Sequence, residues 1–124
     1  MNDMYEDNRV VATEIYHGRL LVVTEMHEPT MQWFCGYAEV LPSDHLPGIE
    51  DGVDWTWETE FKAPGGITFD DELIEFPGKR MLGFDTNHLM MNNQEIDYQM
   101  MLSSCQELAD ELARYSASHG YYKF

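Results

Sequence analysis

Hydrophobic and polar positions alternate along much of the chain before residue 90, a pattern typical of half-buried β-strands. The alternation is clearest at residues 54–61, where Trp55, Trp57 and Phe61 fall on one face and acidic residues fall on the other. Shorter apolar runs occupy residues 10–16, 19–24, 33–41, 67–69 and 81–84. Together these segments predict an antiparallel sheet of five to six strands.

Glycine and proline mark the places where these strands end or bend. The dipeptide His17-Gly18 separates the first two runs, which predicts a tight β-hairpin whose glycine takes a positive φ. Gly36 interrupts the third run and indicates either a bulge or a close approach of another part of the chain. Segment 42–52 is rich in proline, glycine and acids, and it predicts a long acidic surface loop.

The hydrophobic period changes near the C-terminal end. Apolar residues spaced by four, three, four and three positions form one stripe, which comprises Met101, Cys105, Leu108, Leu112 and Tyr115. This stripe predicts a helix over about residues 95–116 that packs across one face of the sheet. The expected fold is α+β, in a single domain over residues 1–124, with a core that includes the aromatic residues Trp33, Trp55, Trp57 and Phe84.

Charge restricts the classes of partner. The chain of 124 residues has 23 acids against 7 Lys and Arg, a formal net charge of −16 and an isoelectric point near 4.3. Nucleic acids and anionic membranes are contacted through Lys and Arg, so direct binding to either is disfavoured. The 44% of hydrophobic residues still predicts a folded protein. We therefore expect basic proteins, cations or small molecules as partners.

The two cysteines and the N-terminal segment predict a cytoplasmic protein with reduced thiols. Cys35 and Cys105 are too few for a disulfide framework, and the polar, acidic segment 1–10 is unlike a signal peptide. No apolar run approaches the roughly 18 residues that span a bilayer. Cys105 lies in the apolar stripe of an acidic helix, where burial raises the pKa of a thiol, and Cys35 has no evident base beside it in the sequence.

Five short blocks follow one another between about residues 14 and 114. They are YHGR at 16–19, CGYAEVLP at 35–42 followed by His45 and Gly48, GGITF at 65–69, GFDTNH at 83–88 and ELADEL at 107–112. In order and spacing these blocks resemble a family of small proteins common in phage and prophage genomes. The resemblance implies a phage origin and a host-cell location, and it implies no particular activity. The chain departs from the family at Pro64, where relatives carry histidine, and at residues 89–92, where they carry Gly-Asp.

One polar constellation is a candidate ligand site. It combines His45, Asp85 and His88 with the turn at Gly65 and Gly66. A carboxylate with imidazoles suits a divalent metal or a general base, and the glycines can present backbone amides to an anion. The same residues also fit an Asx turn and a tight turn between strands. The functional hypothesis here is a protein that binds or cleaves a small molecule or a nucleotide signal. The histidines and cysteines are scattered singly, so no metal or other cofactor is expected.

The concentration of acids supports a different hypothesis. Residues 39–75 contain eleven acids and one base, Lys62. Alternate carboxylates on a strand lie about 6.6 Å apart, a spacing comparable to that of neighbouring phosphates. The main hypothesis is a non-enzymatic anti-defence inhibitor that mimics DNA and blocks a basic host protein, such as a nuclease or a CRISPR effector. The alternatives are a solvated face that maintains solubility, and an apolar contact at 46–49 or 121–124. The candidate partner-binding residues are Glu50, Asp51, Asp54, Glu58, Glu60, Asp70, Asp71 and Glu72.

Overall fold

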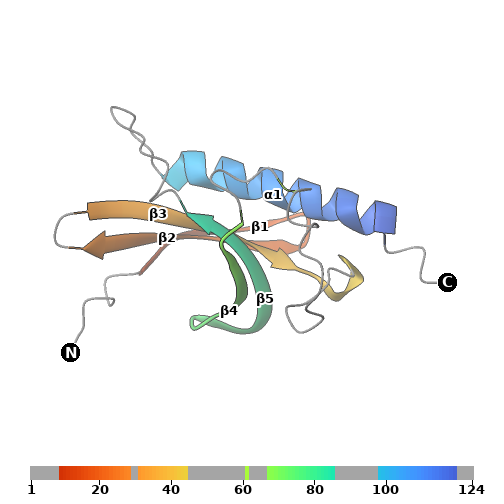
Figure 1. The fold of residues 1–124 in the computed structure, drawn as a ribbon, viewed down its shortest axis with the longest axis horizontal. Helices are drawn as coiled ribbons and strands as arrows, with labels where there is room; N and C mark the ends of the chain where they lie inside the picture. Colours follow the sequence, from red (N-terminus) through yellow and green to blue (C-terminus); the bar gives the residue numbers. More distant parts are fainter. Residues whose placement is uncertain (1–8, 29–30, 45–60, 62–66, 86–97, 120–124) are drawn as a thin grey trace.

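Five antiparallel strands and one long helix make up the part of the chain that the computed structural model describes, namely residues 9–28, 31–44, 61, 67–85 and 98–119 (Figure 1). The strands are β1 (Arg9–Tyr16), β2 (Arg19–Glu28), β3 (Met31–Val40), β4 (Phe69–Leu73) and β5 (Phe76–Asp85), in the order β1-β2-β3-β5-β4. A 3-10 turn, η1 (Pro42–Asp44), follows β3, and the helix α1 spans Tyr98–His119. The α+β fold expected from the sequence is therefore confirmed.

Two sequence-based expectations fall largely outside this described part. The predicted loop at 42–52 begins with η1, but its residues 45–52 are not described. The predicted strand at 54–61 is described only at Phe61, which is buried and stacks on Tyr115 of α1 with ring centroids 5.9 Å apart. This contact places the end of that segment on the helix side of the sheet.

The β1–β2 hairpin has the turn that the sequence predicts. His17 and Gly18 have φ values of 51° and 83°, and Tyr16 pairs with Arg19 across the turn. Positive φ at both central residues is the requirement of a type I′ turn, whose twist matches that of the flanking strands. The sequence identified the glycine as left-handed, and the structure shows that the histidine adopts the same conformation.

Helix α1 packs on one face of the sheet through the predicted stripe. Met101, Cys105, Leu108, Leu112 and Tyr115 are all buried, in one cluster with Leu21 and Val23 of β2, Ala38 and Val40 of β3, and Leu82 and Phe84 of β5. Hydrogen bonds also attach the edge strand β1 to the helix. The Tyr16 hydroxyl donates to Asp110 Oδ1 at 3.1 Å, and Gln106 Nε2 donates to Glu14 Oε1 at 3.0 Å.

The other face of the sheet carries a second apolar cluster. It comprises Leu20, Val22, Tyr37, Leu73 and Met81, which come from β2, β3 and the β4–β5 hairpin. Figure 1 shows this hairpin curving away from the sheet on the side opposite α1. Strand β2 is thus buried on both faces, which explains why its residues 20–23 are continuously apolar.

Glycines at the centre of the sheet allow aromatic rings to lie against the backbone. A Cβ on Gly36 would lie 2.6 Å from Phe84 Cζ and 2.8 Å from Cys105 Sγ, so the predicted close approach is confirmed. Gly36 pairs with Phe84, and Gly83 pairs with Tyr37, whose ring occupies the space that a Cβ on Gly83 would need. Trp33, which was expected in the core, is only half-buried. It shares the face opposite α1 with Tyr37, since strand residues two apart point the same way.

A methyl group at position 36 should destabilise the fold. We expect Gly36→Ala to lower the free energy of unfolding by about 1–3 kcal/mol, because the added atom overpacks the contact between β3, Phe84 and Cys105. Ser103→Ala, on the exposed side of α1, is the control and should change the free energy by less than about 0.5 kcal/mol. Urea unfolding followed by circular dichroism gives both values. Equal stability of the two variants would contradict the tight packing at Gly36.

Candidate functional site

The acids of the β4–β5 hairpin divide into exposed and paired residues. Asp71 and Glu72 of β4 are exposed, as is Glu75 in the adjoining turn. Asp70 differs, because its carboxylate oxygens each accept a 2.7 Å hydrogen bond from Arg80 of β5. We refer to Asp71, Glu72 and Glu75 as the acidic hairpin. The other sequence-predicted partner-binding residues, Glu50, Asp51, Asp54, Glu58 and Glu60, lie outside the described residues.

Four of the five described Lys and Arg side chains form ion pairs within the chain. Three of these pairs join Arg19 to Asp44 at 2.6 Å, Arg80 to Asp70 at 2.7 Å and Lys79 to Glu39 at 3.3 Å. The fourth, at 3.8 Å, joins Arg9 to Glu25. The fifth side chain, Arg114, is exposed on α1. Since the bases are engaged internally, the charge that the described surface offers to a partner is mainly that of carboxylates.

The pair between Arg19 and Asp44 is buried, and the sequence did not reveal it. Two guanidinium nitrogens of Arg19 donate to the two carboxylate oxygens of Asp44, at 2.6 and 2.8 Å. Arg19 Nη1 also donates to the backbone oxygen of Glu39 at 3.1 Å, and Asp44 Oδ2 accepts from the backbone nitrogen of Leu41 at 2.8 Å. The side chains are only 7% and 0% exposed. Asp44 therefore belongs to the interior and contributes nothing to the acidic surface.

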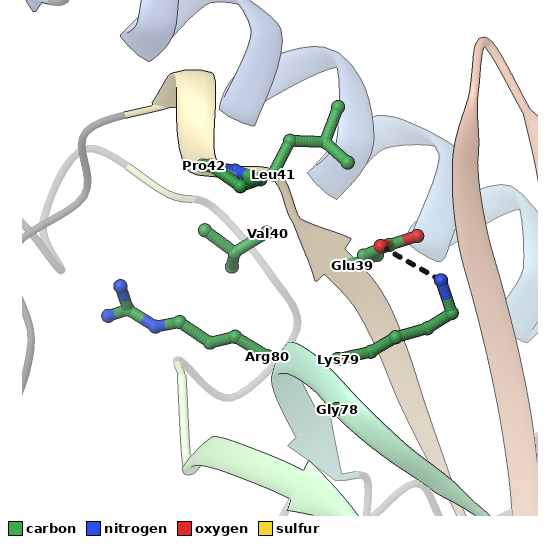
Figure 2. Close-up of a pocket in the computed structure, with 7 residues that line it drawn as sticks. All are labelled: Glu39, Val40, Leu41, Pro42, Gly78, Lys79 and Arg80. Carbon is green, nitrogen blue, oxygen red and sulfur yellow. Dashed lines mark hydrogen bonds and ion pairs between the residues drawn. The ribbon is translucent and has the colours of Figure 1, made fainter.

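A groove of about 290 Å³ opens where β3 and β5 diverge. Its lining residues are Glu39, Val40, Leu41, Pro42, Gly78, Lys79 and Arg80 (Figure 2). The last pair of the β3–β5 register is Val40 with Arg80, and the groove lies at this end of the two strands. On the other side of β5 the pairing with β4 is irregular, because residues 77–80 lie opposite Glu72 alone.

The two cations of this groove are already compensated. Figure 2 shows Lys79 and Arg80 extending in opposite directions, Lys79 toward Glu39. Arg80 is paired with Asp70. Glu39 itself is held by the backbone nitrogen of Leu20, which donates to its Oε1 at 3.0 Å. An anionic ligand would therefore meet carboxylates beside each cation, and the groove is a poor receptor for a phosphate.

The candidate ligand site is described only at Asp85. This residue ends β5, and its Oδ2 accepts a 3.3 Å hydrogen bond from Thr68 Oγ1. The remaining members, His45, Gly65, Gly66 and His88, lie outside the described residues. The structure adds one residue to the surroundings of Asp85, because Asp85 pairs in register with Cys35 of β3. A carboxylate therefore lies on the strand beside Cys35, although the sequence showed no base near that thiol.

Both thiols are held in the protonated state. Burial raises the pKa of Cys35, and the negative charge of Asp85 raises it further. Burial also raises the pKa of Cys105 to about 12, and its Sγ donates to the backbone oxygen of Val22 at 3.9 Å. Cys105 is thus a poor nucleophile, as expected from its position in the stripe. Across the described ranges, no group of three or more His, Cys, Asp and Glu is placed to hold a metal ion.

Comparison with known proteins gives no further guide to function. No family model, curated protein or solved structure matches the chain. Among the described segments, no helix has the length and apolar character needed to cross a bilayer. The chemistry of the chain's own residues is therefore the basis for a proposed function.

The buried ion pair between Arg19 and Asp44 should contribute more to stability than the exposed pair between Arg9 and Glu25. We expect Asp44→Asn to lower the free energy of unfolding by about 3–5 kcal/mol, because it leaves Arg19 charged and buried without a counter-ion. Arg9→Met breaks a pair whose arginine is 69% exposed and should cost less than about 1 kcal/mol. The double variant Arg19→Met/Asp44→Leu should recover part of the loss, since it removes both charges. Chemical denaturation measures all three, and a cost for Asp44→Asn no larger than that for Arg9→Met would contradict this role.

Thiol labelling should report the charge beside Cys35. Asp85→Asn removes a negative charge that raises the pKa of this thiol, so more thiolate forms at mildly alkaline pH and alkylation of Cys35 should accelerate severalfold. Cys105 should stay unlabelled in both folded proteins. Asp71→Asn, an exposed substitution in β4, is the control with the same change of charge. Mass spectrometry of labelled peptides separates the two thiols, and an unchanged rate at Cys35 would show that Asp85 does not influence it.

Proposed function

We propose that this chain is a non-enzymatic, acidic binding protein of phage origin that occupies the nucleic-acid-binding surface of a basic host protein, such as a nuclease or another immune effector. Occupation of that surface would exclude the nucleic acid and so act as an anti-defence function. The observation that carries the proposal is the pairing of four of the five described bases with acids of the same chain. With a formal net charge of −16, acids greatly outnumber the bases that pair with them, and this excess of negative charge would complement a basic groove.

The acidic hairpin is suited to such a contact because its backbone is anchored. Leu73, between Glu72 and the turn, is buried, and Met81 on the facing strand is fully buried. Asp71 Oδ1 also accepts a 2.7 Å hydrogen bond from the backbone nitrogen of Glu72. Carboxylates on an anchored scaffold lose less conformational entropy on binding than those on a flexible tail. Their charge also accelerates the encounter with a basic partner.

The described residues favour binding over catalysis. Both cysteine thiols have raised pKa values, and neither is activated as a nucleophile. The cations that line the groove, Lys79 and Arg80, are each paired with a carboxylate. These features give no specific support to the second hypothesis, a protein that binds or cleaves a nucleotide signal.

A salt-dependent capture experiment tests the proposal. Immobilised protein is exposed to the heparin-binding fraction of a bacterial lysate, which is enriched in basic nucleic-acid-binding proteins. We expect retention of a basic protein that duplex DNA displaces and that elutes as salt rises from about 0.1 to about 1 M, where the Debye length falls from about 10 to about 3 Å. Retention that neither salt nor duplex DNA affects would overturn the proposal.

A pair of variants with equal net charge locates the contact. Asp71→Asn/Glu72→Gln/Glu75→Gln removes three negative charges from the acidic hairpin, and Ser103→Lys/Ala113→Lys/Ala117→Lys adds three positive charges at exposed positions of α1, so the net charge changes equally. The hairpin variant should bind about tenfold more weakly, a loss of about 1.4 kcal/mol, and the helix variant should bind nearly as the wild type does. An equal loss of affinity in both variants would mean that binding depends on net charge alone and not on the hairpin. Full binding by the hairpin variant would exclude the hairpin as the contact.

A further inference from the structure

The tip of the acidic hairpin carries an unusually exposed isoleucine. Ile74 is 93% exposed in the two-residue turn between Leu73 and Phe76. Turn positions favour Gly, Asn, Asp and Ser, and an apolar side chain in water forgoes the stabilisation that burial would give. A polar residue would suit both the turn and the solvent better. Folding alone therefore gives no reason for an isoleucine here.

The turn between β4 and β5, which contains Ile74 and Glu75, has an unusual conformation for a two-residue hairpin. His17 is the one non-glycine residue with positive φ in the described part of the chain, so Ile74 and Glu75 both keep negative φ. The turn is therefore neither type I′ nor type II′, the two that match the twist of paired strands. The pairing that follows the turn is irregular at residues 77–80, where Gly78 has a φ of 87°. Figure 1 shows that the tip of the β4–β5 hairpin points away from α1.

The residues that close the turn hold this tip in place. Leu73 is buried and Phe76 is half-buried, and both belong to the apolar cluster that includes Leu20 and Val22. Ile74 lies directly beyond this anchor in the chain, and Glu72 and Glu75, both exposed, precede and follow it closely in the sequence. An exposed apolar side chain with charged neighbours resembles the composition of an interface hot spot, where an anchor enters a pocket and a polar rim excludes water.

We propose that Ile74 inserts into an apolar pocket of the basic partner, while Asp71, Glu72 and Glu75 pair with Lys and Arg at the rim of that pocket. This inference rests on the proposed function and adds the point of contact to it. The partner that fits is a nucleic-acid-binding protein with an apolar depression within its basic surface. The isoleucine contributes to the lifetime of the complex, and the carboxylates contribute to its rate of formation and to its orientation.

Two exposed isoleucines, Ile74 and Ile15, allow a comparison of the same substitution at two sites. Ile74→Asn removes the proposed anchor, and Ile15→Asn makes the same change on strand β1, where the side chain is 69% exposed. Asparagine is favourable in turns, so Ile74→Asn should unfold at the wild-type temperature, and Ile74→Ala is a second variant that does not add a polar group. Both position-74 variants should be retained about tenfold or more weakly by a partner from the heparin-binding fraction. Their salt dependence should match that of the wild type, because no charge is removed, and Ile15→Asn should bind normally.

The outcomes separate this inference from the function on which it rests. Wild-type binding by Ile74→Asn, together with weak binding by the neutralised hairpin, would overturn the insertion of Ile74 and leave the acidic contact supported. Equal losses in Ile15→Asn and Ile74→Asn would also overturn it. A wild-type dimer in sedimentation that Ile74→Asn dissociates would assign the contact to a second copy of the chain, against the proposal. If the wild type retains no basic protein, the proposed function fails and the insertion fails with it.

Discussion

The ion pair between Arg19 and Asp44 joins the start of β2 to η1, and the corner of the fold where the chain leaves β3 depends on it. Arg19 follows the β1–β2 turn, and Asp44 ends η1, so their contact holds the segment after β3 against the start of β2. The same groups bind the backbone at Glu39 and Leu41, where β3 separates from β5. A buried charge pair of this kind requires all of its hydrogen bonds, so the geometry of this corner is narrowly defined.

Apolar clusters lie on both faces of the described sheet. Helix α1 covers one face, and the curved β4–β5 hairpin contributes to the cluster on the other. The hairpin also places β4 at the edge of the sheet, where Asp70, Asp71 and Glu72 follow one another. Charged, short and irregular edge strands resist pairing with other sheets. Within the described residues, this edge of the sheet therefore exposes mainly the carboxylates of Asp71 and Glu72 and the turn at Ile74 and Glu75.

Features with a local cause could be predicted from the sequence, and features that depend on tertiary pairing could not. The spacing of Met101, Cys105 and Leu108 determined the buried face of α1, and His17-Gly18 determined the first turn, because periodicity and turn chemistry act over a few residues. The contacts of Asp44 and Asp70 join residues 25 and 10 positions away, so both acids looked like surface charges. The neighbourhood of Cys35 and Asp85 likewise exists only once β3 and β5 have paired.

The reciprocal pairs Gly36–Phe84 and Tyr37–Gly83 restrict how the two central strands can align. Each aromatic ring lies over a glycine of the facing strand, and the two rings occupy opposite faces of the sheet. A slip of one residue would reverse which face every side chain of the moving strand occupies, so Phe84 would leave the helix side. The two rings thus select a single register for a pairing that forms between segments distant in the sequence. Because β5 is also one strand of the β4–β5 hairpin, the register chosen during folding fixes where that hairpin, with Ile74 in its turn, joins the sheet.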